Sequence, residues 1–231
     1  MIEEPPVLTI RRPDRRPSAT QIAAFQNTPT SFVVDAMHGS GVLLGIRPLG
    51  EGRDLHCVAA GPALTVDCGP GDILALLAAL PFIKAGDIVV SAFGAHQGVA
   101  AAGDRVTGMM RNSGAAGFVT DGPMRDYAGL VRVGLPAWCA GLNPGSPVST
   151  GPGRIGLPIQ IGGREVETGD MIVADRDGVV IVPFEKLDNV IRQLETVRQL
   201  ESDLDAEIEK GLKSPDAMTE LLSGDGVRYV D

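Results

Sequence analysis

Two short apolar runs on either side of a helical segment constrain the fold of this chain more than any other feature. Residues 88–92 and 117–120 have the length and composition of buried strands, and glycines flank both runs. Between them, residues 105–112 have helical spacing, and Asp104 stands where the N-cap of such a helix would be. A strand, a helix and a second strand in this order predict a crossover between parallel strands of one sheet.

The segments before and after this unit predict one α/β domain. Residues 1–17 contain the basic stretch IRRPDRRP and no apolar period, so we expect an extended, loosely held and solvated N-terminal arm. Ser18 is a candidate N-cap for a first helix. Residues 155–183 are short apolar runs joined by Gly-Gly, Thr-Gly-Asp and Asp-Gly turns, which indicate β-strands and a hairpin.

After Pro183, apolar side chains recur at intervals of three and four residues, which predicts a long amphipathic helix. A helix of roughly 25 residues is about 37 Å long, which is more than the cover of a single domain requires. We therefore divide the chain into the arm, an α/β domain over residues 18–183, and a helical extension over residues 184–231. We expect this extension to contact a neighbouring subunit.

Composition excludes several classes of partner. The formal net charge of −9 makes a nucleic-acid backbone an unfavourable partner. No run of 18 apolar residues and no hydrophobic signal core occurs, so we expect a cytoplasmic protein without membrane contact. The three cysteines are dispersed, which favours reduced, buried thiols over a disulfide framework: Cys57, Cys68 and Cys139.

Common catalytic motifs are also missing from the sequence. There is no nucleophile elbow, no Walker A lysine motif and no Gly-x-Gly-x-x-Gly order. His38, His56 and His96 are too far apart in sequence to predict a histidine-based zinc site. The charged residues near the crossover are therefore the remaining candidates for chemistry.

Asp104 and the adjacent pair Arg125-Asp126 are expected to meet at one edge of the sheet. In a parallel sheet the carboxyl ends of the strands and the amino ends of the crossover helices lie together. The backbone N–H groups of Arg105, Val106 and Thr107 would point outward at such a helix start and could bind an anion. A guanidinium binds a carboxylate bidentately, and an aspartate offers hard oxygens to Mg²⁺ or Mn²⁺.

Each of these residues also has an ordinary structural interpretation. Asp104 alone would be a helix cap, and Arg125-Asp126 alone would be a surface salt bridge. The expected convergence of the three side chains favours a binding site over these separate roles.

The spacing Asp104-x20-Arg125-Asp126 resembles the signature of the class II pyruvate aldolases that act on 4-hydroxy-4-methyl-2-oxoglutarate and 4-carboxy-4-hydroxy-2-oxoadipate. Further segments resemble this family in the expected order, including SFVVDAMHGSG, GDILALLAAL, GAAGFVTDGPMRD and GDMIVADRDGVVIVP. The similarity extends from about residue 28 to residue 183. The same fold includes the regulator of ribonuclease E activity A.

The resemblance implies an α/β-β-α sandwich of the swivelling-domain type, assembled as homo-trimers or hexamers with active sites between subunits. Residues 18–183 would then be the catalytic domain. It implies that Asp126 holds a divalent metal, Mg²⁺ or Mn²⁺, and that Arg125 binds pyruvate and stabilises its enolate. Asp104 would orient water molecules on the metal.

The resemblance also implies how the rest of the site is built. The amides at the helix start, at Gly103, Asp104, Arg105 and Val106, would hold the carboxylate of the 2-oxo acid substrate. A glutamate from the C-terminal helix of the neighbouring subunit would face the metal. Glu201 matches this position best, and Glu195 and Glu207 are alternatives on the same helix.

Two functions follow from this resemblance. The first is a metal-dependent lyase that releases pyruvate by retro-aldol cleavage, with oxaloacetate decarboxylation as a side or main activity. The second is a non-enzymatic regulatory protein like the ribonuclease regulators, which tend to lack the aspartate after the arginine; here Asp126 is present. The physiological substrate, the preferred metal, the choice between trimer and hexamer, and the roles of His38 and His96 are left open.

Overall fold

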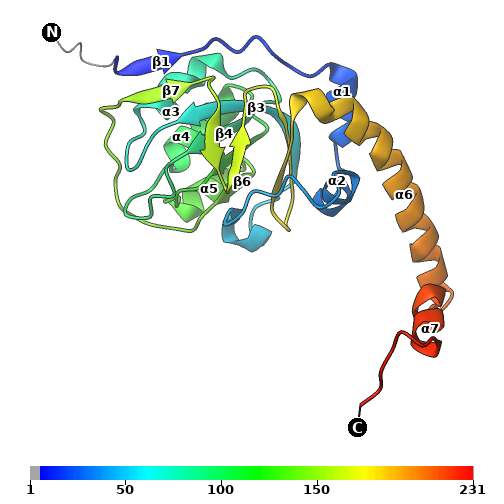
Figure 1. The fold of residues 1–231 in the computed structure, drawn as a ribbon. Coiled ribbons are helices and arrows are strands. Elements are labelled where there is room, and N and C mark those ends of the chain that lie inside the picture. The colour runs from blue at the N-terminus through cyan, green and yellow to red at the C-terminus, as the bar shows by residue number, and fades with distance from the viewer. Residues whose placement is uncertain (1–5, 231) are drawn as a thin grey trace.

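The computed structural model describes residues 6–230 and shows a mixed α/β fold with a long C-terminal helix (Figure 1). Residues 1–5 of the expected arm and residue 231 of the extension lie outside the described residues. The strands are β1 (Leu8–Ile10), β2 (Arg47–Pro48), β3 (Ala59–Asp67), β4 (Ile88–Ala92), β5 (Gly117–Thr120), β6 (Ala137–Cys139), β7 (Gly153–Ile155), β8 (Ile159–Ile161), β9 (Arg164–Val166), β10 (Met171–Ala174) and β11 (Val179–Val182). The helices are α1 (Ala19–Phe25), α2 (Thr30–Ala36), α3 (Leu74–Ala79), α4 (Asp104–Asn112), α5 (Tyr127–Val133), α6 (Leu187–Glu209) and α7 (Asp216–Ser223).

Strands β3, β4, β5 and β6 are parallel neighbours and form the centre of a nine-stranded sheet. The order β1-β7-β3-β4-β5-β6-β2 places the predicted crossover at this centre, because α4 connects β4 to the adjacent β5. The expected strands and helix of this unit are confirmed to within one residue. Helix α5 was not expected; it has only seven residues, too few to give a clear helical period.

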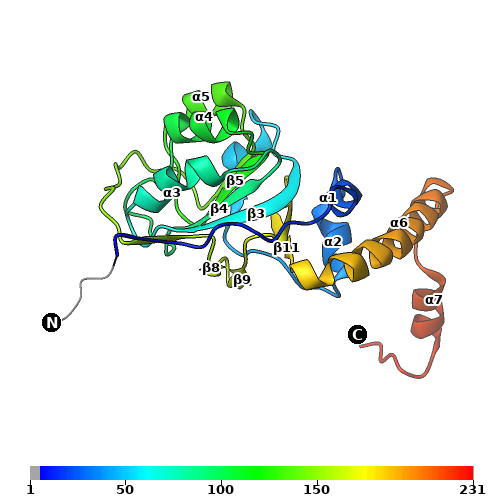
Figure 2. The same ribbon diagram turned by 90° about the horizontal axis from the view of Figure 1, so that it is seen from above.

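The helices form two groups around the sheet. Helices α3, α4 and α5 cover one face, and the small β8–β9 sheet lies on the other side (Figure 2). Helices α1, α2 and α6 instead pack on the β10–β11 hairpin and form a second core. Alternate residues of β10 serve the two cores: Met171 and Val173 face the second core, while Ile172 and Ala174 join the main core.

Helix α6 is packed only at its beginning. Leu187, Val190 and Leu194 are buried in the second core, whereas Leu200, Leu204 and Ile208 are exposed further along the helix. Figure 1 shows α6 leaving the body of the protein, followed by α7. The long C-terminal helix is therefore confirmed, and its second half presents apolar side chains that the described chain does not cover.

The N-terminal arm is extended and most of its described residues are exposed, as expected, but the expectation that it is loosely held is wrong. Strand β1 pairs in parallel with β7. Arg15 lies 3.2 Å from the carboxylate of Asp170, and Arg16 forms an ion pair with Asp87. Both aspartates are almost fully buried, and burial raises the pKa of each. The arginines are held because these carboxylates require cations, a need that the sequence of the arm does not reveal.

Other expectations have a clear outcome. Ser18 caps α1 in a capping box with Gln21. The Asp-Gly pair forms the turn between β10 and β11, which are antiparallel. All three cysteines are free and buried. Within residues 6–230, no helix combines the length and apolar character that crossing a membrane requires.

Replacement of Arg16 by alanine is expected to destabilise the domain by about 1–3 kcal/mol, because it leaves the buried Asp87 carboxylate without its cationic partner. The control is Arg12→Ala, since Arg12 is exposed and forms no hydrogen bond or ion pair with any residue of the range 6–230. Urea unfolding measures both changes. Equal midpoints for the two variants would show that the Arg16–Asp87 ion pair contributes nothing to stability.

Candidate active site

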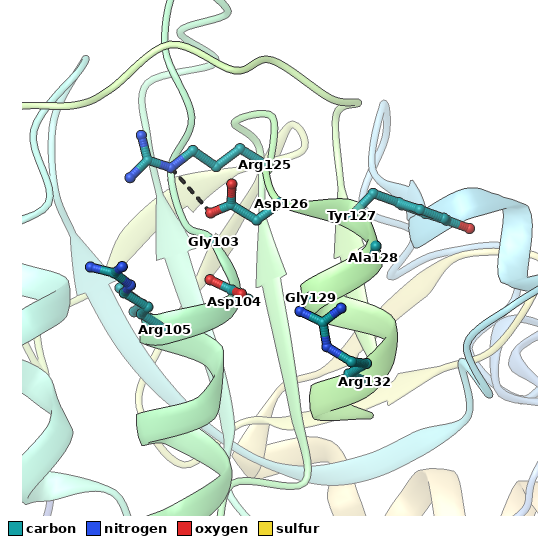
Figure 3. Close-up of a pocket in the computed structure, with 10 residues that line it drawn as sticks. Gly103, Asp104, Arg105, Arg125, Asp126, Tyr127, Ala128, Gly129 and Arg132 are labelled. Carbon is teal, nitrogen blue, oxygen red and sulfur yellow. Dashed lines mark ion pairs between the residues drawn. The ribbon is translucent and has the colours of Figure 1, made fainter.

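A pocket of 660 Å³ opens where the amino end of α4 meets the segment between β5 and α5. Its volume is suitable for a small organic molecule. It is lined by Gly103, Asp104, Arg105, Val106, Arg125, Asp126, Tyr127, Ala128, Gly129 and Arg132. The pocket thus contains six residues singled out from the sequence, which reach it from two separate segments (Figure 3).

Asp104 does not cap α4, contrary to expectation. The N-cap is Gly103, with φ −137° and ψ −171°, and Asp104 is the first residue of the helix, without a side-chain cap hydrogen bond. The N–H of Thr107 donates to the carbonyl of Gly103, so it does not point outward as expected. Within the described chain, the N–H groups of Asp104, Arg105 and Val106 have no hydrogen-bond partner. These groups are free to bind an anion.

Two glycines allow the two walls of the pocket to approach each other. A Cβ atom added to Gly129 would lie 2.6 Å from the Cβ of Asp104, so Asp104 packs directly on the backbone of α5. A Cβ atom added to Gly103 would lie 2.5 Å from Oδ2 of Asp126. Both carboxylates therefore lie against bare backbone of the opposite segment, which brings the two acids into one pocket.

Arg125 is held by two side chains. Its Nη1 donates to Oγ of Ser146 at 2.7 Å, and its Nε lies 3.4 Å from Oδ2 of Asp126. Its backbone N–H donates to the carbonyl of Ala102 at 3.0 Å, which ties the β5–α5 segment to the residues before α4. The guanidinium is therefore fixed in place before any ligand binds.

Asp126 has an unusual backbone conformation. It precedes α5 with φ 64° and ψ 44°, in the left-handed region that few non-glycine residues adopt. Strain of this kind is typical of functional sites, where the surrounding structure imposes it. The side chain is 48% exposed and faces the pocket (Figure 3).

The remaining candidates lie elsewhere in the chain. Glu201 lines a different pocket, of 480 Å³, with Phe32 and Arg198. His38 lies in the turn after α2, and His96 lies after β4 with its ring edge-on to Phe93. None of the three lines the pocket at Asp104. A role for Glu201 in this pocket therefore requires a second subunit and stays a prediction.

The two aspartates of the pocket are suited to a hard divalent metal ion. Within residues 6–230, no group of three or more histidine, cysteine, aspartate or glutamate side chains is arranged to hold a metal. Asp104 and Asp126 nevertheless present hard oxygens to the same space. Mg²⁺ keeps several waters and binds proteins through one or two carboxylates, so this donor set fits Mg²⁺ or Mn²⁺ and does not fit zinc.

Sequence reasoning missed five residues at or beside the pocket: Tyr127, Ala128, Gly129, Arg132 and Ser146. Gly129 and Arg132 line the pocket from α5. A helical period in this segment could have pointed to them, but seven residues are too few to show it. Ser146 comes from a distant loop, and nothing in the sequence connects it to Arg125. The ring of Tyr127 points away from the pocket, and its hydroxyl group donates a hydrogen bond to Oδ2 of Asp54 at 2.7 Å. This hydrogen bond raises the pKa of Tyr127.

The fold and the pocket define an α/β protein with a charged pocket at the carboxyl ends of the parallel strands that form the centre of a mixed sheet. A family model described as RraA-like, Aldolase/RraA, matches residues 30–181. The chain belongs to this family, which confirms the resemblance found in the sequence.

Individual relatives carry two kinds of name. A Halalkalibacterium halodurans protein named "Putative 4-hydroxy-4-methyl-2-oxoglutarate aldolase" is 36% identical over 173 residues, which cover 74% of this chain and 80% of that protein. Streptomyces coelicolor RraAS2, described as an unusual member of the RNase ES inhibitor RraA protein family, has a TM-score of 0.73 at 27% identity, covering 84% of this chain and 99% of RraAS2. A Pseudomonas syringae protein, with a TM-score of 0.73 at 22% identity over 86% of this chain and 96% of its own, supports the fold alone.

Gly129→Ala is expected to destabilise the protein by about 1–3 kcal/mol, because the added methyl group overlaps Asp104. Gly108→Ala on α4 is the matched control: its Cβ meets only a methyl group of Val133 at 3.8 Å, so helix propensity should stabilise it by about 0.5–1 kcal/mol. Thermal or urea unfolding measures both values. A gain in stability for both variants would contradict the close packing of Asp104 on α5.

Proposed function

We propose that this protein is a divalent-metal-dependent lyase that cleaves 4-hydroxy-2-oxo acids to pyruvate by retro-aldol chemistry and also decarboxylates oxaloacetate. One observation carries the proposal: Asp104, Arg125 and Asp126, from separate segments, line one pocket together with a free helix N-terminus. The 36% identical relative, whose name is "Putative 4-hydroxy-4-methyl-2-oxoglutarate aldolase", supports it. The substrates considered are 4-hydroxy-4-methyl-2-oxoglutarate and 4-carboxy-4-hydroxy-2-oxoadipate.

Both reactions convert the substrate into the enolate of pyruvate, so negative charge develops on the 2-oxo oxygen. Arg125 is suited to stabilise this charge, because Ser146 and Asp126 fix its guanidinium and leave Nη2 without a partner in the described chain. The N–H groups at the start of α4 are suited to hold the C1 carboxylate, with the positive end of the helix dipole behind them.

Asp126 is the residue that would hold the metal ion directly, and Asp104 would orient water molecules on it. Asp126 is the exposed, strained acid at the start of α5, and Asp104 faces it from the start of α4. Mg²⁺ or Mn²⁺ bound there would supply Lewis-acid stabilisation of the charge on the 2-oxo oxygen.

The cleavage step also requires a proton acceptor. As the bond between C3 and C4 breaks, its electrons form the enolate, the 4-hydroxyl group loses its proton and C4 becomes a carbonyl carbon. Among residues 6–230, no histidine lines the pocket. Asp104, acting through a water molecule that it holds, is therefore the proposed acceptor. In oxaloacetate the departing group is carbon dioxide, and no hydroxyl proton has to be removed.

Helix α6 has a surface on which a second subunit could pack. Leu200, Leu204 and Ile208 form an exposed apolar stripe on the same helix as Glu201. Burial of this stripe on a neighbouring copy is a favourable use of surface that the described chain leaves uncovered. We propose that the protein forms a homo-trimer or hexamer in which Glu201 completes the pocket of the neighbouring subunit.

A regulatory role without catalysis is the alternative. The similarity to RraAS2 favours it, because that protein is described as a member of a ribonuclease inhibitor family. A lactate-dehydrogenase-coupled pyruvate assay decides between the two functions. Pyruvate formation from the two aldol acids or oxaloacetate, abolished by EDTA and restored by Mg²⁺, is expected for the lyase. No pyruvate from any of them, with or without EDTA, would favour the regulatory role.

Arg125→Ala and Asp126→Asn are each expected to lower the turnover number at least about 100-fold, since each removes an electrostatic group from the transition state. Asparagine is chosen at position 126 because it tolerates the left-handed backbone conformation. The coupled assay measures turnover, and Asp225→Asn at an exposed position controls for the lost charge. Near-normal turnover of both folded variants would refute the assignment.

Glu201→Ala is expected to inactivate the enzyme, and a mixed assembly should recover part of the lost activity. If Glu201 acts across a subunit interface, subunits with Glu201→Ala and subunits with Arg125→Ala should form some complete pockets after they are unfolded and refolded together. Activity of the mixture is compared with that of each variant refolded alone. A mixture that stays as inactive as its components, despite mixed assembly shown by native mass spectrometry, would exclude a shared site.

A further inference from the structure

The pocket contains more positive charge than the pyruvyl half of the substrate uses. Arg105, Arg125 and Arg132 line it together with two aspartates. Arg125 is paired with Asp126 and Ser146, whereas the side chains of Arg105 and Arg132 form no hydrogen bond or ion pair with any residue of the range 6–230. An unpaired guanidinium on the wall of a pocket is suited to bind a further anionic group.

Arg132 lies on the pocket side of α5. It follows Ala128 by four residues and Gly129 by three, and residues at these spacings share one face of a helix. All three line the pocket, and the small side chains of the other two leave the guanidinium unobstructed. Figure 3 shows Arg132 on the opposite side of Asp104 from Arg105 and Arg125.

This arrangement separates two cationic regions within one pocket. Arg125 and the start of α4 lie on the side proposed to hold the 2-oxo acid group. Arg132 is the cation on the other side of Asp104. Asp104 is the proposed acceptor of the 4-hydroxyl proton, so C4 of the substrate would lie near it. A substrate whose 2-oxo acid group lies on the side of Arg125 would therefore place its departing half on the side of Arg132.

Both substrates considered above have a second carboxylate on the departing half, and we propose that Arg132 is the residue of this chain that binds it and so discriminates against analogues with a neutral end. The substrate class rests on the proposed function. The contact itself is a carboxylate held by the guanidinium fork and does not require cleavage to occur.

Binding tests the contact without catalysis. 2-Oxoglutarate and 2-oxopentanoate have the same chain length and differ by the terminal carboxylate, and calorimetry with Mg²⁺ gives their dissociation constants. The native protein is expected to bind 2-oxoglutarate more tightly. Arg132→Met should weaken 2-oxoglutarate binding by about 10- to 100-fold and leave 2-oxopentanoate unchanged, because only the charged hydrogen bonds are lost. Arg132→Lys should retain part of the preference.

The matched control is Arg164→Met, which removes the same charge from an exposed position on β9. It should bind both acids as the native protein does. Equal weakening of both acids by Arg132→Met, or no preference in the native protein, would overturn the proposal.

The cleavage rates of two substrates, one with a charged and one with a neutral departing half, test the same contact during turnover. For Arg132→Met, kcat/KM is expected to fall about 10- to 100-fold with 4-hydroxy-4-methyl-2-oxoglutarate and to stay unchanged with 4-hydroxy-2-oxopentanoate, whose departing half is neutral. An equal fall for both substrates would indicate a structural role and overturn the proposal. If the native protein cleaves neither acid, the lyase assignment fails, and the two binding constants still decide whether Arg132 holds the second carboxylate.

Discussion

The parallel pairing of β4 with β5 is the constraint on which the rest of the site depends. Parallel strands require a crossover, and the crossover returns through α4, whose free amino end then lies beside the end of β5. This places Asp104 next to Arg125 and Asp126 although twenty residues separate them in the sequence. An antiparallel pairing would have put these charges at opposite ends of the sheet.

The parts of the fold that could be predicted are those in which a local pattern and the global structure agree. The 88–92 and 117–120 strands and the helix between them have clear apolar runs with glycine at their ends, and the long C-terminal helix has a sustained period. Helix α5 escaped prediction because seven residues give too little period. The arm was misjudged because its partners Asp87 and Asp170 become buried only in the folded domain.

In the candidate site too, some residues could be predicted from the sequence and others depend on tertiary packing. The three charged residues could be found from their spacing and from strand topology, since both are properties of the chain order. Ser146, which holds Arg125, comes from a loop whose position depends on the tertiary packing of several segments. Asp104 was correctly placed at the helix start, but its capping role was wrong because Gly103 takes the N-cap position and α5 approaches closely enough to contact the carboxylate.

The glycines at positions 103 and 129 have a consequence for how this pocket can change in evolution or by design. The floor of the pocket is formed by Gly103 and Gly129, where there is no room for a side chain. A substitution there cannot create a new ligand contact without separating the two walls. The rim is different, because Arg105, Ala128 and Arg132 are exposed and can be exchanged at little cost in packing. Relatives with the same acid and arginine centre can therefore diverge in ligand preference while their floor stays constant.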